Sequence, residues 1–152
     1  MLKAINLGVI NFSYSDGAHQ TTGNVAGILE KKYEILTNFA QAHEDEIAKL
    51  LTTAMENVVK EHIQTGKVNK SSFNTAFSKI GNEMKRFLST QEVEKMGIAG
   101  VPTKAALDGV SHRFKRKRKG FARGKTRYRA RRPSFIDTGQ MESSYIVWGD
   151  FK

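Results

Sequence analysis

The sequence predicts a helix-rich α+β fold in a single domain spanning residues 1–152. A chain of 152 residues is long enough for one domain that buries roughly 70% of the surface of its unfolded chain. Apolar residues at helical spacing fill the middle of the chain, and short runs typical of strands stand at its two ends. We therefore expect helices packed on a small sheet in which the N- and C-terminal strands pair.

The N-terminal strand is indicated by alternating apolar residues, which shift phase once. The two sets are Ile5, Leu7 and Val9, then Ile10, Phe12 and Tyr14. This pattern predicts a strand with a bulge, followed by a turn at 15–17. At the other end, the β-branched and aromatic run from Tyr145 to Trp148 predicts a strand. A neighbouring molecule's strand could complete this small sheet.

Helices are expected between these strands, each marked by an apolar stripe and end signals. Asn24 is the expected cap of the first helix, and Asp45 and Glu46 favour the start of the second, which Gly66 ends. The third begins after Ser71 or Ser72 and buries Phe73, Ala76, Phe77, Ile80, Met84, Phe87 and Leu88. A capping box of Ser89 and Glu92 predicts a short fourth helix. Thr103 is expected to cap a helical turn over 104–107.

Composition excludes several classes of protein. The chain has no cysteine, which excludes disulfides and thiolate chemistry. No stretch approaches the length of a membrane span, and we expect no membrane association. The N-terminus shows no secretion signal, which is consistent with production in the cytoplasm.

The net charge of +10 is concentrated in one basic segment, residues 113–132. This basic segment contains twelve cations and no acid, and the rest of the chain has 13 basic against 15 acidic residues. The cations are Arg113, Lys115, Arg116, Lys117, Arg118, Lys119, Arg123, Lys125, Arg127, Arg129, Arg131 and Arg132. Such a charge density must be solvated or neutralised by an acidic partner. We expect a long loop that contacts nucleic acid or an acidic protein surface, the alternative being a solvated loop without a defined partner.

Aromatic residues interleave with these cations, and they could stack on bases or anchor the loop to protein. They are Phe114, Phe121 and Tyr128. Arg127, Arg129 and Arg131 also alternate with uncharged residues, so a strand there would present one cationic face. Contact with nucleic acid would be driven by phosphates, steeply salt-dependent and poorly sequence-specific.

The sequence Asp137-Thr138-Gly139 after two apolar residues matches the catalytic loop of aspartic proteases. In those all-β enzymes two carboxylates share a proton and activate water. A mostly helical chain with Gln140 after the glycine lacks that context, so the simpler interpretation is a turn whose Asp137 or Thr138 caps a short helix. We expect no enzyme.

The four histidines are scattered, and only His43 and Glu46 could share a helix face. No His-Glu-x-x-His arrangement, phosphate-binding loop or nucleophile elbow is present. We therefore expect no metal, no cofactor and no catalytic residue.

The C-terminal third resembles the neck and tail-completion proteins of tailed bacteriophages. The resemblance rests on 100–107, on 109–114 before the basic loop, and on 132–144 after it. Within the last stretch, the family's turn is matched by Pro133, Asp137, Thr138, Gly139 and Ser144. The chain departs from the family in its long, highly charged loop and in starting with a strand rather than an amphipathic helix.

This resemblance implies a structural virion protein, assembled in the host cytoplasm and located in the neck or tail. Such proteins form homo-oligomeric rings, for example hexamers, at the head–tail junction around a channel that DNA traverses. The implied partners are other head–tail connector, tail-tube or sheath proteins, with non-specific contact of the basic loop to DNA. The alternatives are a baseplate or other tail component, and a small nucleic-acid-binding module that uses the segment as a basic arm.

Overall fold

The protein is described by a computed structural model that covers residues 2–14, 20–109, 130–136 and 139–152. The described chain is helix-rich, with one two-stranded antiparallel sheet, which confirms the predicted α+β class. The elements in chain order are β1 (Leu2–Val9), α1 (Thr22–Tyr33), α2 (Ile35–Ala42), α3 (Glu44–Thr65), α4 (Ser71–Ser89), α5 (Glu92–Lys95), α6 (Lys104–Leu107), α7 (Gln140–Ser144) and β2 (Tyr145–Phe151).

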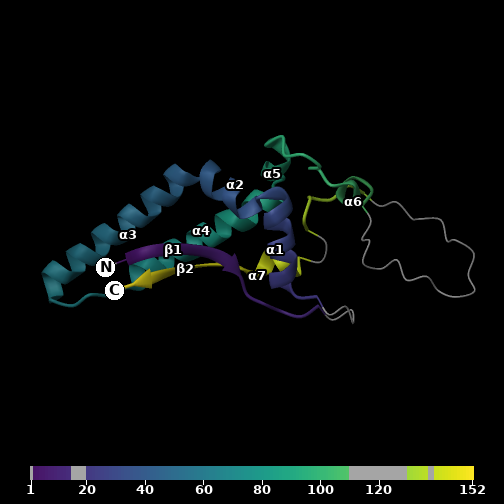
Figure 1. The fold of residues 1–152 in the computed structure, drawn as a ribbon. Coiled ribbons are helices and arrows are strands. Elements are labelled where there is room, and N and C mark those ends of the chain that lie inside the picture. The colour runs from purple at the N-terminus through teal and green to yellow at the C-terminus, as the bar shows by residue number, and fades with distance from the viewer. Residues whose placement is uncertain (1, 15–19, 110–129, 137–138) are drawn as a thin grey trace, which may run out of the picture.

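The two terminal strands pair as the sequence predicts. Leu2 lies opposite Phe151 and Val9 opposite Tyr145, so the two ends of the chain lie side by side (Figure 1). The irregularity in the ladder falls between Leu2 and Ala4. The bulge predicted near Ile10 is therefore wrong, and β1 ends at Val9 instead of continuing through the second apolar set.

Helices α3 and α4 form the long antiparallel hairpin of the fold, and the sheet packs on α4 (Figure 1). All seven inward residues predicted for α4 are buried. Gly66 ends α3 with a φ of 70°, a left-handed conformation that glycine adopts without a steric penalty. Helical periodicity and end signals thus predicted this hairpin correctly.

The first predicted helix differs in its cap, and the helical spacing that runs from Val25 to Phe39 is divided between two helices. Its N-cap is Thr21 instead of Asn24, because the Thr21 hydroxyl accepts the Asn24 amide at 3.2 Å. The helix breaks at Glu34, whose φ of 50° starts the new helix α2. The Glu30 carboxylate compensates for this break by accepting the amides of Leu36 and Thr37 at the start of α2.

The predicted capping box at Ser89 is also wrong. Ser89 is the last residue of α4, and its hydroxyl donates back to the Arg86 carbonyl. Gln91 occupies the N-cap of α5 without a side-chain cap bond. Thr103, by contrast, caps α6 as predicted, since its hydroxyl accepts the Ala106 amide at 3.3 Å.

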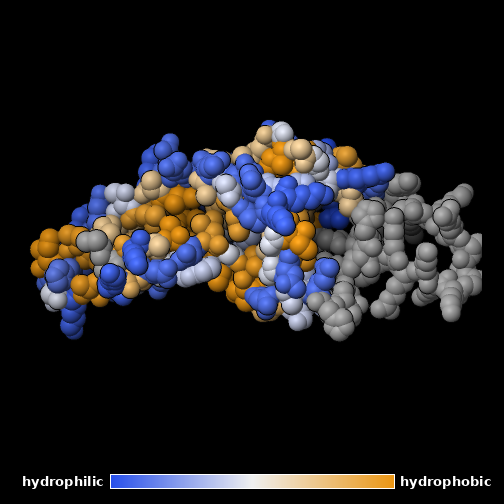
Figure 2. All heavy atoms as spheres, in the orientation of Figure 1, coloured by the Kyte–Doolittle hydropathy of each residue, from blue (hydrophilic) through white to orange (hydrophobic). Residues whose placement is uncertain are grey.

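The core has two parts. One lies where α1, α2 and α5 meet the C-terminal half of α4, around Phe39, Phe87 and Val93, none of which is exposed to solvent. The other lies between α3, the N-terminal half of α4 and the strands. This second part opens to solvent through an apolar groove of about 520 Å³, lined by Leu2, Leu51, Met55, Val59 and Phe73 among others. Figure 2 shows apolar residues gathered between α3 and the sheet.

No helix in the described ranges combines the length and hydropathy that a membrane-spanning segment requires.

Candidate interaction site at the base of the basic segment

The basic segment lies mostly outside the described residues. Arg113 to Arg129, with ten of the twelve cations, are not described, so their predicted contacts remain predictions. The structure does describe the two stretches of chain at which the segment leaves and re-enters the domain, which we call its two bases. One base is α6 with Gly109, and the other is 130–136.

The two bases are joined by a direct backbone hydrogen bond. The Arg132 amide donates to the Ala106 carbonyl at 3.1 Å, and Ala106 is fully buried. Ser134, which is also fully buried, adds a second tie because its hydroxyl accepts the Thr103 amide at 3.1 Å. The basic segment therefore leaves and re-enters the domain at one fixed place.

Glu94 of α5 holds this place to the rest of the domain. Its side chain is only 5% exposed, and its carboxylate accepts the Ser134 amide at 2.8 Å and the Arg131 guanidinium. Burial by itself raises the pKa of Glu94, but the hydrogen bonds from Ser134 and Arg131 and the positive charge of Arg131 outweigh it. The net effect is a pKa below the ordinary value, so the carboxylate is ionised at neutral pH. We call Glu94, Thr103, Arg131 and Ser134 the loop clasp.

Two of the predicted partner-contacting cations thus have partners within the chain. Arg131 pairs with Glu94, although its own side chain is 51% exposed, and the Arg132 guanidinium donates to the Ile136 carbonyl. Arg131 lies in no strand, while Arg127 and Arg129 fall outside the described residues, so a cationic strand face is not tested. The structure gives Arg131 and Arg132 a role in fixing the base of the segment.

The turn that carries the family resemblance follows directly. Asp137 and Thr138 lie outside the described residues, and Pro133 is partly buried beside Ser134. Gly139, with a φ of 74°, stands at the N-cap of α7, where no side-chain cap bond forms. Helix α7 begins at Gln140 as expected, but the cap position belongs to Gly139 instead of Asp137 or Thr138.

Ser144 ends this turn and leads into β2. Its fully buried hydroxyl donates to the Met141 carbonyl at 2.7 Å. Its own carbonyl accepts the Ile10 amide at 2.8 Å, which extends the ladder between the two ends of the chain. Of the turn residues that the structure describes, Gly139 precedes α7 and Ser144 joins this helix to the sheet, while Pro133 is partly buried beside the loop clasp.

The His43 side chain packs against two core aromatic rings. Its ring centroid lies 4.8 Å from that of Phe39 and 5.8 Å from that of Phe87, and these two rings also contact each other. Its Nδ1 lies 3.4 Å from Glu46, and its Nε2 lies 3.0 Å from Glu92, at an angle that is not that of a hydrogen bond. These contacts tie α5 to the junction of α2 and α3. Within the described ranges no group of three or more His, Asp or Glu residues could hold a metal ion.

Sequence reasoning missed the loop clasp almost completely. Glu94 is one of two acids in a four-residue helix, and it meets Ser134 across 40 positions of sequence. Only the absence of acids within the basic segment suggested that a neutralising group must lie elsewhere.

A comparison of the chain with models of protein families, with curated proteins and with solved structures finds no match in any of the three.

Proposed function

We propose that this chain is a structural subunit of a tailed bacteriophage, a ring-forming neck or tail-completion protein at the head–tail junction. In this proposal the basic segment docks on a neighbouring ring or faces the DNA channel. The protein performs no chemistry, and its role is to join other components.

The observation that carries the proposal is the separation of charge between a fixed domain and one anchored segment. Twelve cations stand in a segment whose two ends are held together by the loop clasp, while the rest of the chain is close to neutral. A loop anchored at both ends loses less conformational freedom on docking than a free arm does. Repetition around a ring would multiply the positive field several-fold.

Light scattering coupled to size exclusion tests the ring. We expect a closed oligomer of defined mass that does not grow with protein concentration, as ring closure requires. A monomer at every concentration would contradict the ring.

A DNA titration across salt concentrations tests the role of the basic segment. In the test variant, glutamine replaces the five consecutive cations Lys115, Arg116, Lys117, Arg118 and Lys119. If these contact phosphates, the slope of log K against log salt should become shallower by about 4 to 5. The matched control removes five exposed lysines outside the segment, namely Lys31, Lys49, Lys67, Lys79 and Lys95. Equal losses in the two variants would mean that net charge alone, and not this segment, drives binding.

The nucleic-acid-binding module remains the second candidate, because Phe114, Phe121 and Tyr128 interleave with the cations. The same two measurements separate it from the ring. A monomer that binds DNA through the segment supports the module, whereas a closed oligomer supports the ring.

A further inference from the structure

The outer edge of β2 has no strand beside it in the described residues. Within the part of the chain that the structure describes, β1 and β2 pair only with each other. A two-stranded sheet is only marginally stable by itself, and each of its strands has a second edge. Charge and proline protect an exposed edge from pairing with another chain, and β2 carries neither from Tyr145 to Gly149.

The ladder pattern shows which backbone groups face that edge. Hydrogen-bonded and non-bonded residue pairs alternate in an antiparallel ladder. Because the Ile10 amide donates to the Ser144 carbonyl, the pairs that exchange bonds farther along are Gly8 with Ile146 and Asn6 with Trp148. The amides and carbonyls of Val147 and Gly149 therefore point to the open edge of β2.

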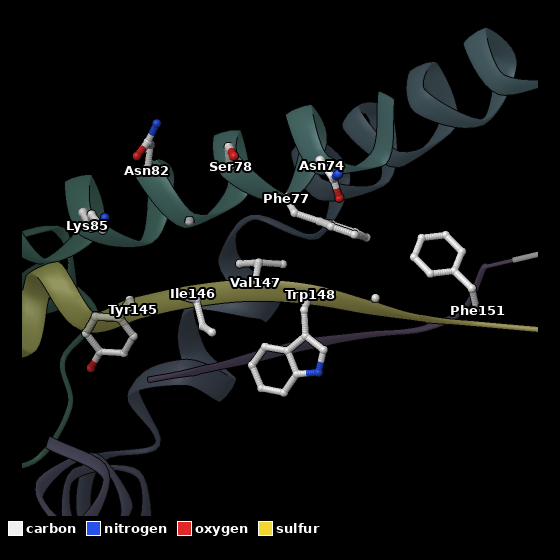
Figure 3. Close-up of a pocket in the computed structure, with 12 residues that line it drawn as sticks. Asn74, Phe77, Ser78, Asn82, Lys85, Tyr145, Ile146, Val147, Trp148 and Phe151 are labelled. Atoms are coloured by element: carbon white, nitrogen blue, oxygen red, sulfur yellow. The ribbon is translucent and has the colours of Figure 1, made fainter. Parts of the chain in front are cut away.

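A groove of about 440 Å³ runs along this edge, between β2 and α4 (Figure 3). Three neutral polar residues of α4, spaced four apart, line it, namely Asn74, Ser78 and Asn82. All three are exposed, and Lys85 is the single charged residue among the groove's lining. In a chain of net charge +10, this surface neither repels another copy of the chain nor attracts a strongly charged ligand.

The outer face of the sheet shows what kind of strand fits beside β2. Ile146 and Trp148 point away from α4 (Figure 3) and are 37% and 43% exposed. On β1, Gly8 lies opposite Ile146 and Asn6 lies opposite Trp148. A Cβ on Gly8 would lie 2.9 Å from the Trp148 ring, so the indole covers this glycine, and the Asn6 side-chain amide donates to Asp150 at 3.0 Å. A second strand with small outer residues would receive the other side of the Ile146 and Trp148 side chains.

We infer that the open edge of β2 pairs, antiparallel, with the open edge of β1 from a second copy of this chain. The outer face of β1 carries no large apolar side chain, only Ala4, Asn6 and Gly8, and its own second edge is unpaired in the described chain. Antiparallel pairing places the end that carries Lys3 beside the end of β2 that carries Asp150, both exposed and of opposite charge. The alternative is that β2 pairs with β2 of a second copy. If all seven residues pair, this contact is centred on Trp148, and the charged Asp150 of each copy lies opposite the apolar Ile146 of the other.

Head-to-tail pairing of this kind leaves one β2 edge and one β1 edge free at the two ends of a row of copies. These two edges meet in a ring when the rotation between neighbouring copies closes, and a row that does not close grows into a filament. The inference rests on the proposed function, since it names the contact that would join neighbouring subunits of the ring. It commits to a second copy as the occupant of the groove.

The first test compares full-length wild type with Ile146→Lys, which puts a charge on the outer face beside the edge. Ile63→Lys is the matched control, because Ile63 is 78% exposed on α3 and does not line the groove beside β2. We expect wild type and Ile63→Lys to form the same oligomer by light scattering, and Ile146→Lys to lose it. Circular dichroism confirms that each variant is folded.

Hydrogen exchange on the wild type supplies a measurement that needs no variant. If the edges pair, the amides of Val147 and Gly149 should exchange at least about tenfold more slowly in the oligomer than in the monomer obtained by dilution. Rapid exchange of both amides within an intact oligomer would overturn the strand pairing while leaving the ring in place. A monomer at every concentration would overturn both.

Mixing Ile146→Lys with wild type shows which strand of the second copy pairs with the β2 edge. Ile146→Lys has a damaged β2 edge but an intact β1 edge, so it should bind to wild type, co-elute with it and reduce the mean mass of the oligomer. If wild type forms only a dimer and excludes Ile146→Lys, then β2 pairs with β2 of the second copy. This result would overturn the inference that β1 is the pairing strand. If Ile146→Lys assembles exactly like wild type, the edge is not the contact.

Discussion

Replacement of Glu94 by glutamine tests whether the loop clasp holds the base of the basic segment by charge. Glutamine keeps the size of the side chain but loses the negative charge. The charge-assisted bond from the buried Ser134 amide then becomes a neutral bond, weaker by about 1 kcal/mol. The pair with Arg131, whose side chain is half exposed, adds at most about 0.5 kcal/mol. We expect the free energy of unfolding at neutral pH to fall by about 1 to 1.5 kcal/mol.

The effect of Glu94→Gln should depend on pH in a defined direction. The folded-state pKa of Glu94 is lowered from the ordinary value of 4.5. The ionised carboxylate therefore stabilises the fold above that ordinary value, and this contribution is lost as the pH falls through the folded-state pKa. Glutamine does not titrate, so the difference between wild type and variant should be constant well above the ordinary pKa of 4.5 and shrink as the pH falls below that value.

Urea unfolding followed by fluorescence of Trp148, the single tryptophan, measures this difference at one fixed protein concentration. The control is Glu83→Gln, which removes an exposed pair with Arg86 one helical turn away and should cost about 0.3 to 0.5 kcal/mol. A difference for Glu94→Gln that is the same at low and neutral pH, or no larger than that of the control, would refute the clasp.

Two further predictions concern the packing that supports the sheet. Ala at Gly149 would place a Cβ 2.5 Å from the Phe77 ring, so we expect a loss of about 1 to 3 kcal/mol by thermal unfolding. Gly27→Ala in α1 is the control, since a Cβ there meets nothing within 4 Å, and it should raise the free energy of unfolding by about 0.5 to 1 kcal/mol. Equal effects at Gly149 and Gly27 would contradict the close packing of Gly149 on Phe77. Thr22→Val keeps the shape of a buried side chain but leaves the Phe12 amide without its acceptor at 2.8 Å. We expect a cost of about 1 to 3 kcal/mol in urea, and a neutral result would mean that water reaches this amide.

The elements that the sequence predicted well are those whose signals are local. Helices α3 and α4 show long apolar stripes, acids at the start of α3 and a glycine at its end, and all of these depend on residues within a few turns. The pairing of the two terminal strands was expected because runs typical of strands stand at the two ends of the chain. Local patterns were sufficient for the fold class.

The errors arose where a side chain from another turn decided the outcome. Glu34 is a helix-compatible residue, and nothing in its neighbourhood predicts a left-handed φ. The break becomes stable because Glu30, four residues earlier, caps the helix that follows. Ser89 matched the capping box, but α4 continued through it because its apolar stripe extends to Leu88.

Of the candidate sites, only the basic segment could be predicted from the sequence. It was visible there because charge is a property of each residue separately. The loop clasp and the open edge of β2 were not, since each depends on residues brought together by the fold. Glu94 meets Ser134 across 40 positions, and the groove beside β2 joins α4 to the last strand.

The basic segment and the β2 edge can act in one assembly because they share no residues. The base of the segment lies beside α5 and α6, whereas the open edge runs along α4 toward the chain termini at the other end of the molecule (Figure 1). Contact through the edge is nearly neutral, so bringing together copies that each carry a charge of +10 is opposed mainly by repulsion between their basic segments. Salt screens this repulsion and favours the strand contact, while it weakens binding of the segment to DNA. An acidic partner would relieve the same repulsion, so docking of the segment and closure of the ring should strengthen one another.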